Sequence, residues 1–346
     1  MLAAIQQELA MQRHYLQGAS LASIYLGGGT PSLLSTAELV QLFETIQALY
    51  PVLPDAEITL EANPDDLSRE KLSDLRAYTP VNRLSIGIQS FNDADLQWMH
   101  RAHNAQHAHD CLRYAAALGF EDLTIDLIYG SPTTSDAQWA ENLRLMLDYH
   151  IPHLSCYCLT VEEGTALHHF VKKGKSLPVD EDKAIRQFEY LMEVSEKNGY
   201  DHYEISNFAK PGHYARHNSN YWRGVPYLGI GPSAHAFDGL HRQWNIANNT
   251  KYIQAIQNGI VPFERETLTP AQRYNEYIMT ALRTIWGVEP EKIKQIGQPF
   301  FDRFFADIQS YQNNGMVEVH QGAFRLTKAG KLLADRIAME LFLTAD

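Results

Sequence analysis

The chain has 346 residues, of which 45% are hydrophobic and 20% charged, and its formal net charge is −12. This length can hold one large domain and one small one, and the acidic balance argues against a sequence-independent nucleic-acid binder, which needs basic side chains to neutralise phosphates. The sequence contains no apolar run of about eighteen residues, so no membrane span is expected. Its start lacks the basic and then apolar order of a signal peptide. Its three cysteines suit a reducing cytoplasm better than a disulfide scaffold.

The first half of the sequence alternates between amphipathic helical segments and short β-like segments. The helical pattern predicts helices over residues 2–16, 36–49, 69–76, 93–101, 106–118 and 136–147. Apolar runs predict strands over residues 24–26, 57–61, 83–89, 123–128 and 153–159. This alternation predicts a parallel sheet with right-handed crossovers. Gly119 stands where a helix C-terminal cap is expected.

The alternation stops after residue 159. The charged stretch 172–182, which contains Pro178, predicts a surface loop, and a helix is expected over 182–199. Residues 201–250 are rich in His, Asn, Tyr, Trp and Gly and have little periodicity. Such a stretch is too long for a plain loop in a compact domain, which favours a functional role.

The C-terminal part of the sequence is helical from residue 269 onward. It also contains two β-like segments, 316–319 and 323–326, and a last helical segment, 328–342. Helices followed by a short hairpin and a helix predict a small winged-helix-like domain.

A glycine-rich segment, Tyr-Leu-Gly-Gly-Gly-Thr-Pro-Ser at 25–32, is the most informative short stretch. Gly27, Gly28 and Gly29 lack the Cβ atoms that would block a close approach to the backbone. No Gly-Lys-Ser/Thr follows and the spacing is not G-x-G-x-x-G, so neither phosphate-binding motif fits. The backbone groups suit a polar, amino-acid-like ligand, although a plain strand-to-helix turn stays an equal alternative.

Each predicted strand ends in a polar group, and ligands of parallel α/β folds bind beyond these carboxyl ends. The series comprises Thr30, Glu61 with Asn63, Gln89, Asp126, and then Tyr157, Cys158 and Thr160. Buried carboxylates need partners, so Glu61 and Asp126 are candidates to bind an ammonium or a ribose hydroxyl group. Arg101 could clamp a carboxylate. Each residue alone could cap a helix, but the whole series favours a ligand site.

The longer motifs resemble the oxygen-independent coproporphyrinogen III oxidase-like branch of the radical S-adenosylmethionine (SAM) proteins, and within it the HemW-type heme chaperones. The matching strings include YLGGGTPSLLS at 25–35, EITLEANPDDLS at 57–68, NRLSIGIQSFND at 82–93, TIDLIYGSP at 124–132 and RHNSNYWRG at 216–224. The resemblance covers nearly the whole chain. It implies an α/β fold with a partial (βα)6 barrel over 1–165, a barrel extension over 166–265 and a small helical, winged-helix-like domain over 266–346.

The resemblance also implies a role for individual residues. Gly28, Gly29 and Thr30 fall on the loop that meets the methionine part of SAM. The further implied SAM contacts are Glu61, Gln89, Arg101 and Asp126, with Thr160 through its backbone. Most of these residues also belong to the strand-end series.

The family carries a Cys-x3-Cys-x2-Cys loop that holds a [4Fe-4S] cluster, and this sequence has no such motif. Cys111 falls on a predicted helix, and Cys156 and Cys158 fall on a strand where packing is their expected role. The resemblance places the first barrel strand and the cluster loop before Met1. A mis-assigned start, a truncation and a degenerate paralogue stay open as explanations. We expect these 346 residues by themselves not to cleave SAM.

A second candidate site is Arg216-His217-Asn218-Ser219-Asn220-Tyr221-Trp222, which resembles the HNxxYW string of the heme chaperones, whose histidine is the proposed heme ligand. A neutral imidazole can ligate heme iron, and Tyr221 and Trp222 can cover a porphyrin face. A structural loop is an equal alternative. The clustered His100, His103, His107 and His109 lack an HExxH pattern and are expected on a solvated helix face.

Three functions are therefore open. The first is a heme chaperone that binds heme and passes it to acceptor proteins, with peripheral contact to membrane-bound heme proteins. The second is an enzyme that oxidatively decarboxylates coproporphyrinogen III with a SAM-derived radical. The third is a remnant that binds neither ligand. The HNxxYW string favours the chaperone.

Overall fold

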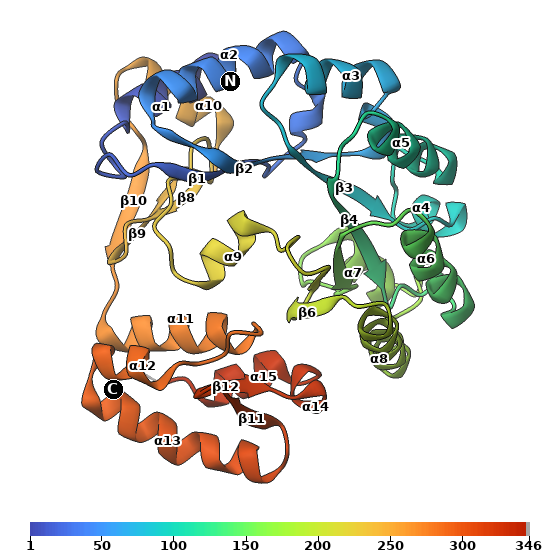
Figure 1. The fold of residues 1–346 in the computed structure, drawn as a ribbon, viewed down its shortest axis with the longest axis vertical. Coiled ribbons are helices and arrows are strands. Elements are labelled where there is room, and N and C mark those ends of the chain that lie inside the picture. Colours follow the sequence, from blue (N-terminus) through green and yellow to red (C-terminus); the bar gives the residue numbers. More distant parts are fainter. Residues whose placement is uncertain (344–346) are drawn as a thin grey trace. The chain divides into compact units, whose positions relative to one another are not determined.

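The computed structural model describes residues 1–343, which form two compact units (Figure 1). The first unit comprises Met1–Ile24, Ala37–Ala56 and the chain from Arg216 onward, and the second comprises Tyr25–Thr36 and Glu57–Ala215. Two strands, β1 (Leu21–Leu26) and β2 (Val52–Ala62), contribute residues to both units.

The main sheet has the strand order β1-β2-β3-β4-β5-β7-β6. Its further strands are β3 (Arg83–Gln89), β4 (Asp122–Tyr129), β5 (His153–Cys158), β6 (Asp201–Glu204) and β7 (Asn207–Ala209). Parallel pairing from β2 through β5 confirms the predicted parallel sheet. The antiparallel strands β7 and β6 extend it beyond β5. They lie in the stretch for which the sequence predicted no regular element, because strands this short show no periodicity.

Helices of the second unit lie along the outer side of β3 and β4 in Figure 1. They are α3 (Arg69–Tyr78), α4 (Asp93–Trp98), α5 (Ala105–Ala117), α6 (Asp136–Asp148) and α8 (Glu181–Lys197). Ser135 and Gln138 form a capping box that starts α6. Gly119, with φ +77°, follows α5 in the left-handed conformation expected of a helix end. The short helix α7 (Ala166–Lys172) was not predicted, while residues 173–180 form the expected loop.

In the first unit, the N-terminal helix α1 (Leu2–Met11) contacts α10 (Asn249–Gln257). The helix is shorter than the predicted 2–16, because the chain turns and reaches Gly18 with φ +81°. Fully buried Glu8 accepts hydrogen bonds from Gly231 N, Asn245 Nδ2 and Tyr252 Oη at 2.6–2.8 Å. These bonds tie α1 to the chain around residues 231–252, which the sequence had left without structure.

The remaining elements of the first unit include α2 (Thr36–Leu49), which has the predicted bounds. A three-stranded antiparallel sheet follows, with β8 (His235–Phe237), β9 (His241–Asn245) and β10 (Phe263–Thr267). The C-terminal elements are α11 (Pro270–Leu282), α12 (Pro290–Ile296), α13 (Gln298–Asn313), β11 (Val317–His320), β12 (Ala323–Leu326), α14 (Lys328–Lys331) and α15 (Ala334–Glu340).

The C-terminal helices and the β11–β12 hairpin follow one another in the predicted order (Figure 1). Phe304 and Phe324 join α13 to the hairpin with rings edge to face, their centroids 5.2 Å apart. The predicted last helix is divided into α14 and α15. Across residues 1–343, no helix combines the length and the apolar character that crossing a membrane would need.

Candidate functional site

The first candidate site is built around Glu61, near the carboxyl end of β2. Tyr25 Oη donates a hydrogen bond to Glu61 Oε1 over 2.7 Å, and the Gly28 backbone N–H donates to Oε2 over 3.2 Å. A Cβ atom on Gly27 would lie 2.5 Å from Tyr25 Cε1 and 2.7 Å from Glu61 Cδ. Gly27 therefore makes room for two side chains of the protein itself, where the sequence analysis expected room for a ligand.

The rest of the glycine loop is exposed. Gly28 has φ +74°, a conformation that L side chains rarely adopt, and a Cβ atom on Gly29 would meet no atom within 4 Å. Thr30, also exposed, accepts a hydrogen bond at its carbonyl from Leu33 N over 3.2 Å, at the start of the 3-10 helix Pro31–Leu33. The backbone at Gly28 to Thr30 is thus accessible, as a ligand-binding loop requires.

Gln89 and Arg101 meet above Gly87 in β3. A Cβ atom on Gly87 would lie 2.8 Å from Gln89 Nε2 and 3.3 Å from Arg101 Nη2. Gln89 has φ +64°, and the β3–β4 register shifts between Ile86 and Gln89. Such backbone strain in a non-glycine residue is concentrated at functional sites. Arg101 Nη2 donates to Asn63 Oδ1 over 2.8 Å, so residues that follow two neighbouring strands come together.

A pocket of about 230 Å³ opens beside Arg101 and Asn63. Its lining consists of Asn63, Asp65, Met99, His100, Arg101, Ala102 and His103. The guanidinium of Arg101 makes the pocket suitable for a carboxylate group.

Asp126 on β4 shares an electrostatic environment with Glu61. Burial raises the pKa of Asp126 from its ordinary value of 3.8 to about 7, with the nearby negative charge of Glu61 as the second cause. Burial and the Glu61 carboxylate also raise the pKa of Tyr25. Tyr25 was not among the predicted site residues, although its place directly before the glycine loop was a usable signal.

Thr160 and the three cysteines differ in how far they are exposed. Thr160 is exposed beyond the end of β5. Cys111 and Cys156 are buried as expected, and burial raises the pKa of the Cys111 thiol to about 12. Cys158 is exposed, so packing alone does not describe it. No group of three or more potential ligands among residues 1–343 could hold a metal ion, and the residues present therefore do not fit a [4Fe-4S] cluster.

The histidine cluster is only partly solvated: His100 and His107 are exposed, as the sequence predicted, whereas His103 is not. His103 is buried, and its Nε2 lies 3.0 Å from the carbonyl oxygen of Ile88. Burial lowers the pKa of this imidazole. His107 instead completes the capping box of α5 with Asn104. These contacts give both histidines structural roles.

The second candidate site lies on helix α9 (Arg216–Trp222) in the first unit, drawn in yellow in Figure 1. His217 Nδ1 lies 3.0 Å from the hydroxyl oxygen of Ser23 on β1. Burial lowers the pKa of His217 from 6.5 to about 4, so the imidazole is neutral at physiological pH. Ser23 was missed in the sequence, because no local pattern pairs residues this far apart.

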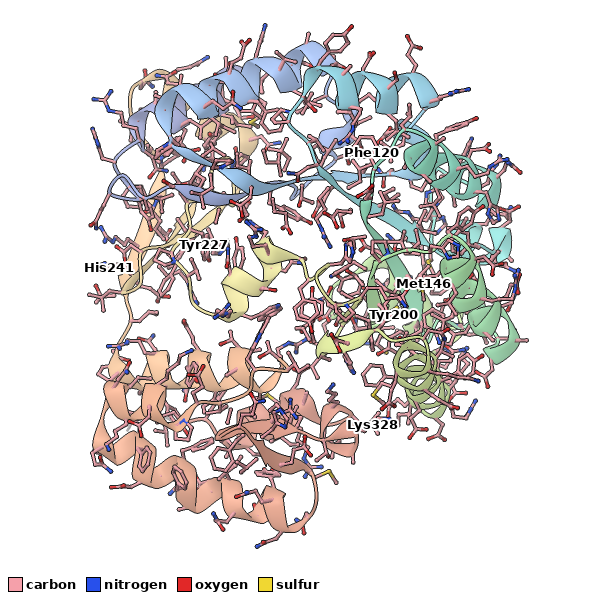
Figure 2. All side chains as sticks on the ribbon, viewed as in Figure 1. Phe120, Met146, Tyr200, Tyr227, His241 and Lys328 are labelled. Atoms are coloured by element: carbon pink, nitrogen blue, oxygen red, sulfur yellow. The ribbon has the colours of Figure 1, made fainter. Side chains whose placement is uncertain are left out.

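Tyr221 lies one helical turn after His217, and their ring centroids are 5.2 Å apart. Tyr221 is 42% exposed and also contacts Tyr227, labelled beside α9 in Figure 2, at 4.2 Å. Trp222 has different neighbours: the Arg283 guanidinium lies 5.6 Å from its ring centroid. The structure therefore brings His217 and Tyr221 together and places Trp222 against α11 and its C-terminal end.

Comparison with known proteins gives a consistent result over the whole chain. Residues 5–146 match the radical SAM superfamily, and residues 268–333 match the HemN C-terminal domain. Heme chaperone HemW of Mycobacterium tuberculosis is 31% identical, covering 98% of this chain and 85% of the relative. Heme chaperone HemW of Bacillus subtilis is 32% identical, covering 97% of this chain and 89% of the relative.

A solved structure also resembles this fold. Coproporphyrinogen III oxidase (HemN) from Escherichia coli, a radical SAM enzyme, has a TM-score of 0.83 and covers 99% of this chain and 82% of its own. Its sequence identity is 24%, so this likeness concerns the fold alone. It confirms the α/β fold with a curled half-barrel sheet and a C-terminal helical domain.

Proposed function

The chain belongs to the HemW family of heme chaperones in the radical SAM superfamily, and from this we propose that it binds heme and passes it to acceptor proteins. The observation that carries the proposal is the placement of His217 on α9, with its Nδ1 3.0 Å from the Ser23 hydroxyl oxygen and the Tyr221 ring beside it. Its imidazole is neutral, because burial lowers its pKa to about 4. A neutral imidazole is the form that ligates iron.

The surroundings of His217 fit a ligand to heme iron. The Ser23 hydroxyl group at 3.0 Å from Nδ1 orients the imidazole ring that would hold the iron. Tyr221, whose ring is tilted by 60° against that of His217 and is partly exposed, offers an aromatic surface to a porphyrin face. Trp222 belongs to the proposed heme site at its edge, since its ring is packed under Arg283.

A hemin titration followed at the Soret band tests this site. We expect His217→Ala to weaken hemin binding about 100-fold and to change the spectrum, because the iron–nitrogen bond is lost. His320→Ala is the matched control, since His320 is an exposed histidine on β11. A His217→Ala protein with the affinity and spectrum of the parent would refute His217 as the ligand.

We propose in addition that the second unit binds SAM. Arg101 would clamp the methionine carboxylate, and Glu61 would accept from the ammonium or a ribose hydroxyl group. The remaining proposed contacts are Gln89 and Asp126, with the backbone of Gly28, Gly29, Thr30 and Thr160. The pocket beside Arg101 and the exposed glycine loop support this assignment.

Bound SAM supplies an adenosyl group on a sulfonium that a reduced [4Fe-4S] cluster can cleave to a radical. Since the three cysteines do not fit such a cluster, the proposed SAM-contacting residues only bind and orient SAM. Arg101 and Asn63 hold one end of the pocket, and Glu61 is kept in place by Tyr25 and Gly28.

The cellular setting follows from the same proposal. Cys111, Cys156 and Cys158 are free thiols in the described chain, which suits a reducing cytoplasm. Heme proteins, including membrane-bound ones reached at the membrane surface, would be the acceptors. The alternative activity, decarboxylation of coproporphyrinogen III, has only the shared fold in its favour, and an assay for product porphyrin separates it from the chaperone.

A further inference from the structure

A small pocket of about 50 Å³ lies in the first unit beside the C-terminal end of α9. Its lining includes Trp222, Arg223, Tyr277, Trp286, Lys292 and Glu289, whose carboxylate pairs with Lys292. The pocket has room for several water molecules or for one carboxylate group. It combines aromatic rings with basic side chains.

Trp222, one of the residues that line this pocket, carries a hydrogen-bond donor. Its indole Nε1 is buried and finds no acceptor among residues 1–343. A buried donor without a partner is costly, and an indole N–H can only donate. The group that completes this site therefore has to bring an acceptor atom, such as a carboxylate oxygen.

Basic side chains lie over several aromatic rings at this pocket. The Arg223 guanidinium lies 5.6 Å from the Trp286 ring centroid. Two other cations are balanced by acids: Arg283 Nη1 lies 2.6 Å from an Asp335 oxygen, and Lys292 Nζ lies 2.7 Å from a Glu289 oxygen.

Arg223 differs from these two cations. Its side chain is exposed, and it has no ion-pair partner within residues 1–343. An arginine stacked on an aromatic ring is held in place and still presents its planar donors, which match a carboxylate. Arg223 is thus the cation of this pocket with an unbalanced charge.

We propose that Arg223 and the indole N–H of Trp222 bind a propionate carboxylate of the heme whose iron is held by His217. This inference rests on the proposed heme-binding function. Arg223 continues the helix, since its N–H donates to the Ser219 carbonyl over 3.1 Å. The rise from His217 to Arg223 is then about 9 Å, comparable with the reach of a propionate arm from the iron. Arg223 lies about 120° around the axis from His217, and its long side chain spans that difference.

The test compares hemin with hemin dimethyl ester, in which both carboxylates are blocked. For Arg223→Ala, we expect hemin binding to weaken about tenfold and binding of the diester to stay unchanged. For Trp222→Phe, which removes the N–H donor and keeps a smaller aromatic ring, we expect about threefold weaker hemin binding and an unchanged diester. Arg223→Lys keeps the charge and should lie between parent and Arg223→Ala. Arg303→Ala, an exposed arginine on α13, is the control with no effect.

The outcomes separate this inference from the proposed function. An equal loss for hemin and diester in Arg223→Ala, or no loss for either, overturns the carboxylate site even when His217→Ala abolishes the Soret change. If Arg223→Ala weakens binding of hemin but not of the diester, while His217→Ala binds hemin like the parent, the carboxylate site is supported and His217 is refuted as the iron ligand. Failure of the parent to bind hemin overturns both. Circular dichroism of each variant shows that the fold is retained.

Discussion

Burial shifts the pKa of a titratable group in opposite directions in the strand-end site around Glu61 and in the α9 site around His217. Burial raises the pKa of the Asp126 acid to about 7 and lowers the pKa of the His217 base to about 4. The cause is the same in both, since desolvation disfavours whichever form carries charge. Asp126 therefore titrates near neutral pH, whereas His217 stays neutral throughout the physiological range.

The two sites also differ in how they are assembled. The Glu61 site collects residues from successive parallel strands and holds them with polar partners from other segments, such as Tyr25 and Gly28. On α9, His217 and Tyr221 meet because they are one helical turn apart. A carboxylate site needs several partners to offset desolvation, while one imidazole needs only orientation.

The largest expected effect is on the pH dependence of stability. The folded pKa of Asp126 lies above its unfolded value, so its contribution is present below about pH 4 and is lost as pH rises toward 7. The loss should approach about 1.4 kcal/mol per pH unit between these limits. Urea unfolding at a series of pH values measures the slope, and Asp126→Asn should remove it. An unchanged slope in Asp126→Asn would contradict the assignment.

His217 should act in the opposite sense. Its folded pKa is depressed, so its contribution is present above about pH 6.5 and is lost as pH falls toward 4. His217→Ala should flatten stability in this window, with a smaller total change than for Asp126 because the window is narrower. The same urea series measures it, with His320→Ala as control. A variant with the parent's profile would mean that His217 is not shielded from solvent.

Glu61→Ala should destabilise the second unit by about 2 kcal/mol, because the Tyr25 hydroxyl and the Gly28 N–H lose their acceptor. Glu61→Gln keeps an acceptor oxygen and should cost about half as much. In both variants the pKa of Asp126 should fall, since a neighbouring negative charge is removed. Denaturation and NMR titration of Asp126 provide the measurements. A pKa of Asp126 that does not move would refute the coupling.

Arg101→Ala should weaken SAM binding about tenfold, because the fork that would hold the methionine carboxylate is lost. Arg144→Ala is the matched control, since Arg144 is exposed on α6 and pairs with Glu141. Calorimetry with SAM gives both affinities. Equal binding by the parent and Arg101→Ala would place the SAM carboxylate elsewhere.

The smallest expected effect belongs to Ser23→Ala. Loss of its hydroxyl group frees Nδ1 of His217 from one orienting contact, and hemin affinity should fall about threefold with the iron ligand retained. The Soret position should therefore stay closer to the parent than that of His217→Ala. A loss as large as that of His217→Ala would mean that Ser23 is more than an orienting residue.

Much of the second unit was predictable from local patterns. The alternation of helices and strands predicted the parallel sheet, and β3 has the predicted bounds. Glu61 and Gln89 stand where the strand-end rule expected them, at the ends of β2 and β3, whereas Asp126 lies inside β4, three residues before its end. The role of Gly27 was not predictable, because the side chains that need its missing Cβ include one from another strand.

The sequence by itself determined the elements and the candidate residues, since helix and strand periodicity, capping residues and motif strings are local properties. Only the tertiary structure decided which of these residues are buried, and with which partners. His103 became a buried structural residue, and Trp222 turned toward Arg283 rather than His217. Burial and long-range contacts depend on segments far apart in the chain, and these contacts set the pKa values on which both proposed sites depend.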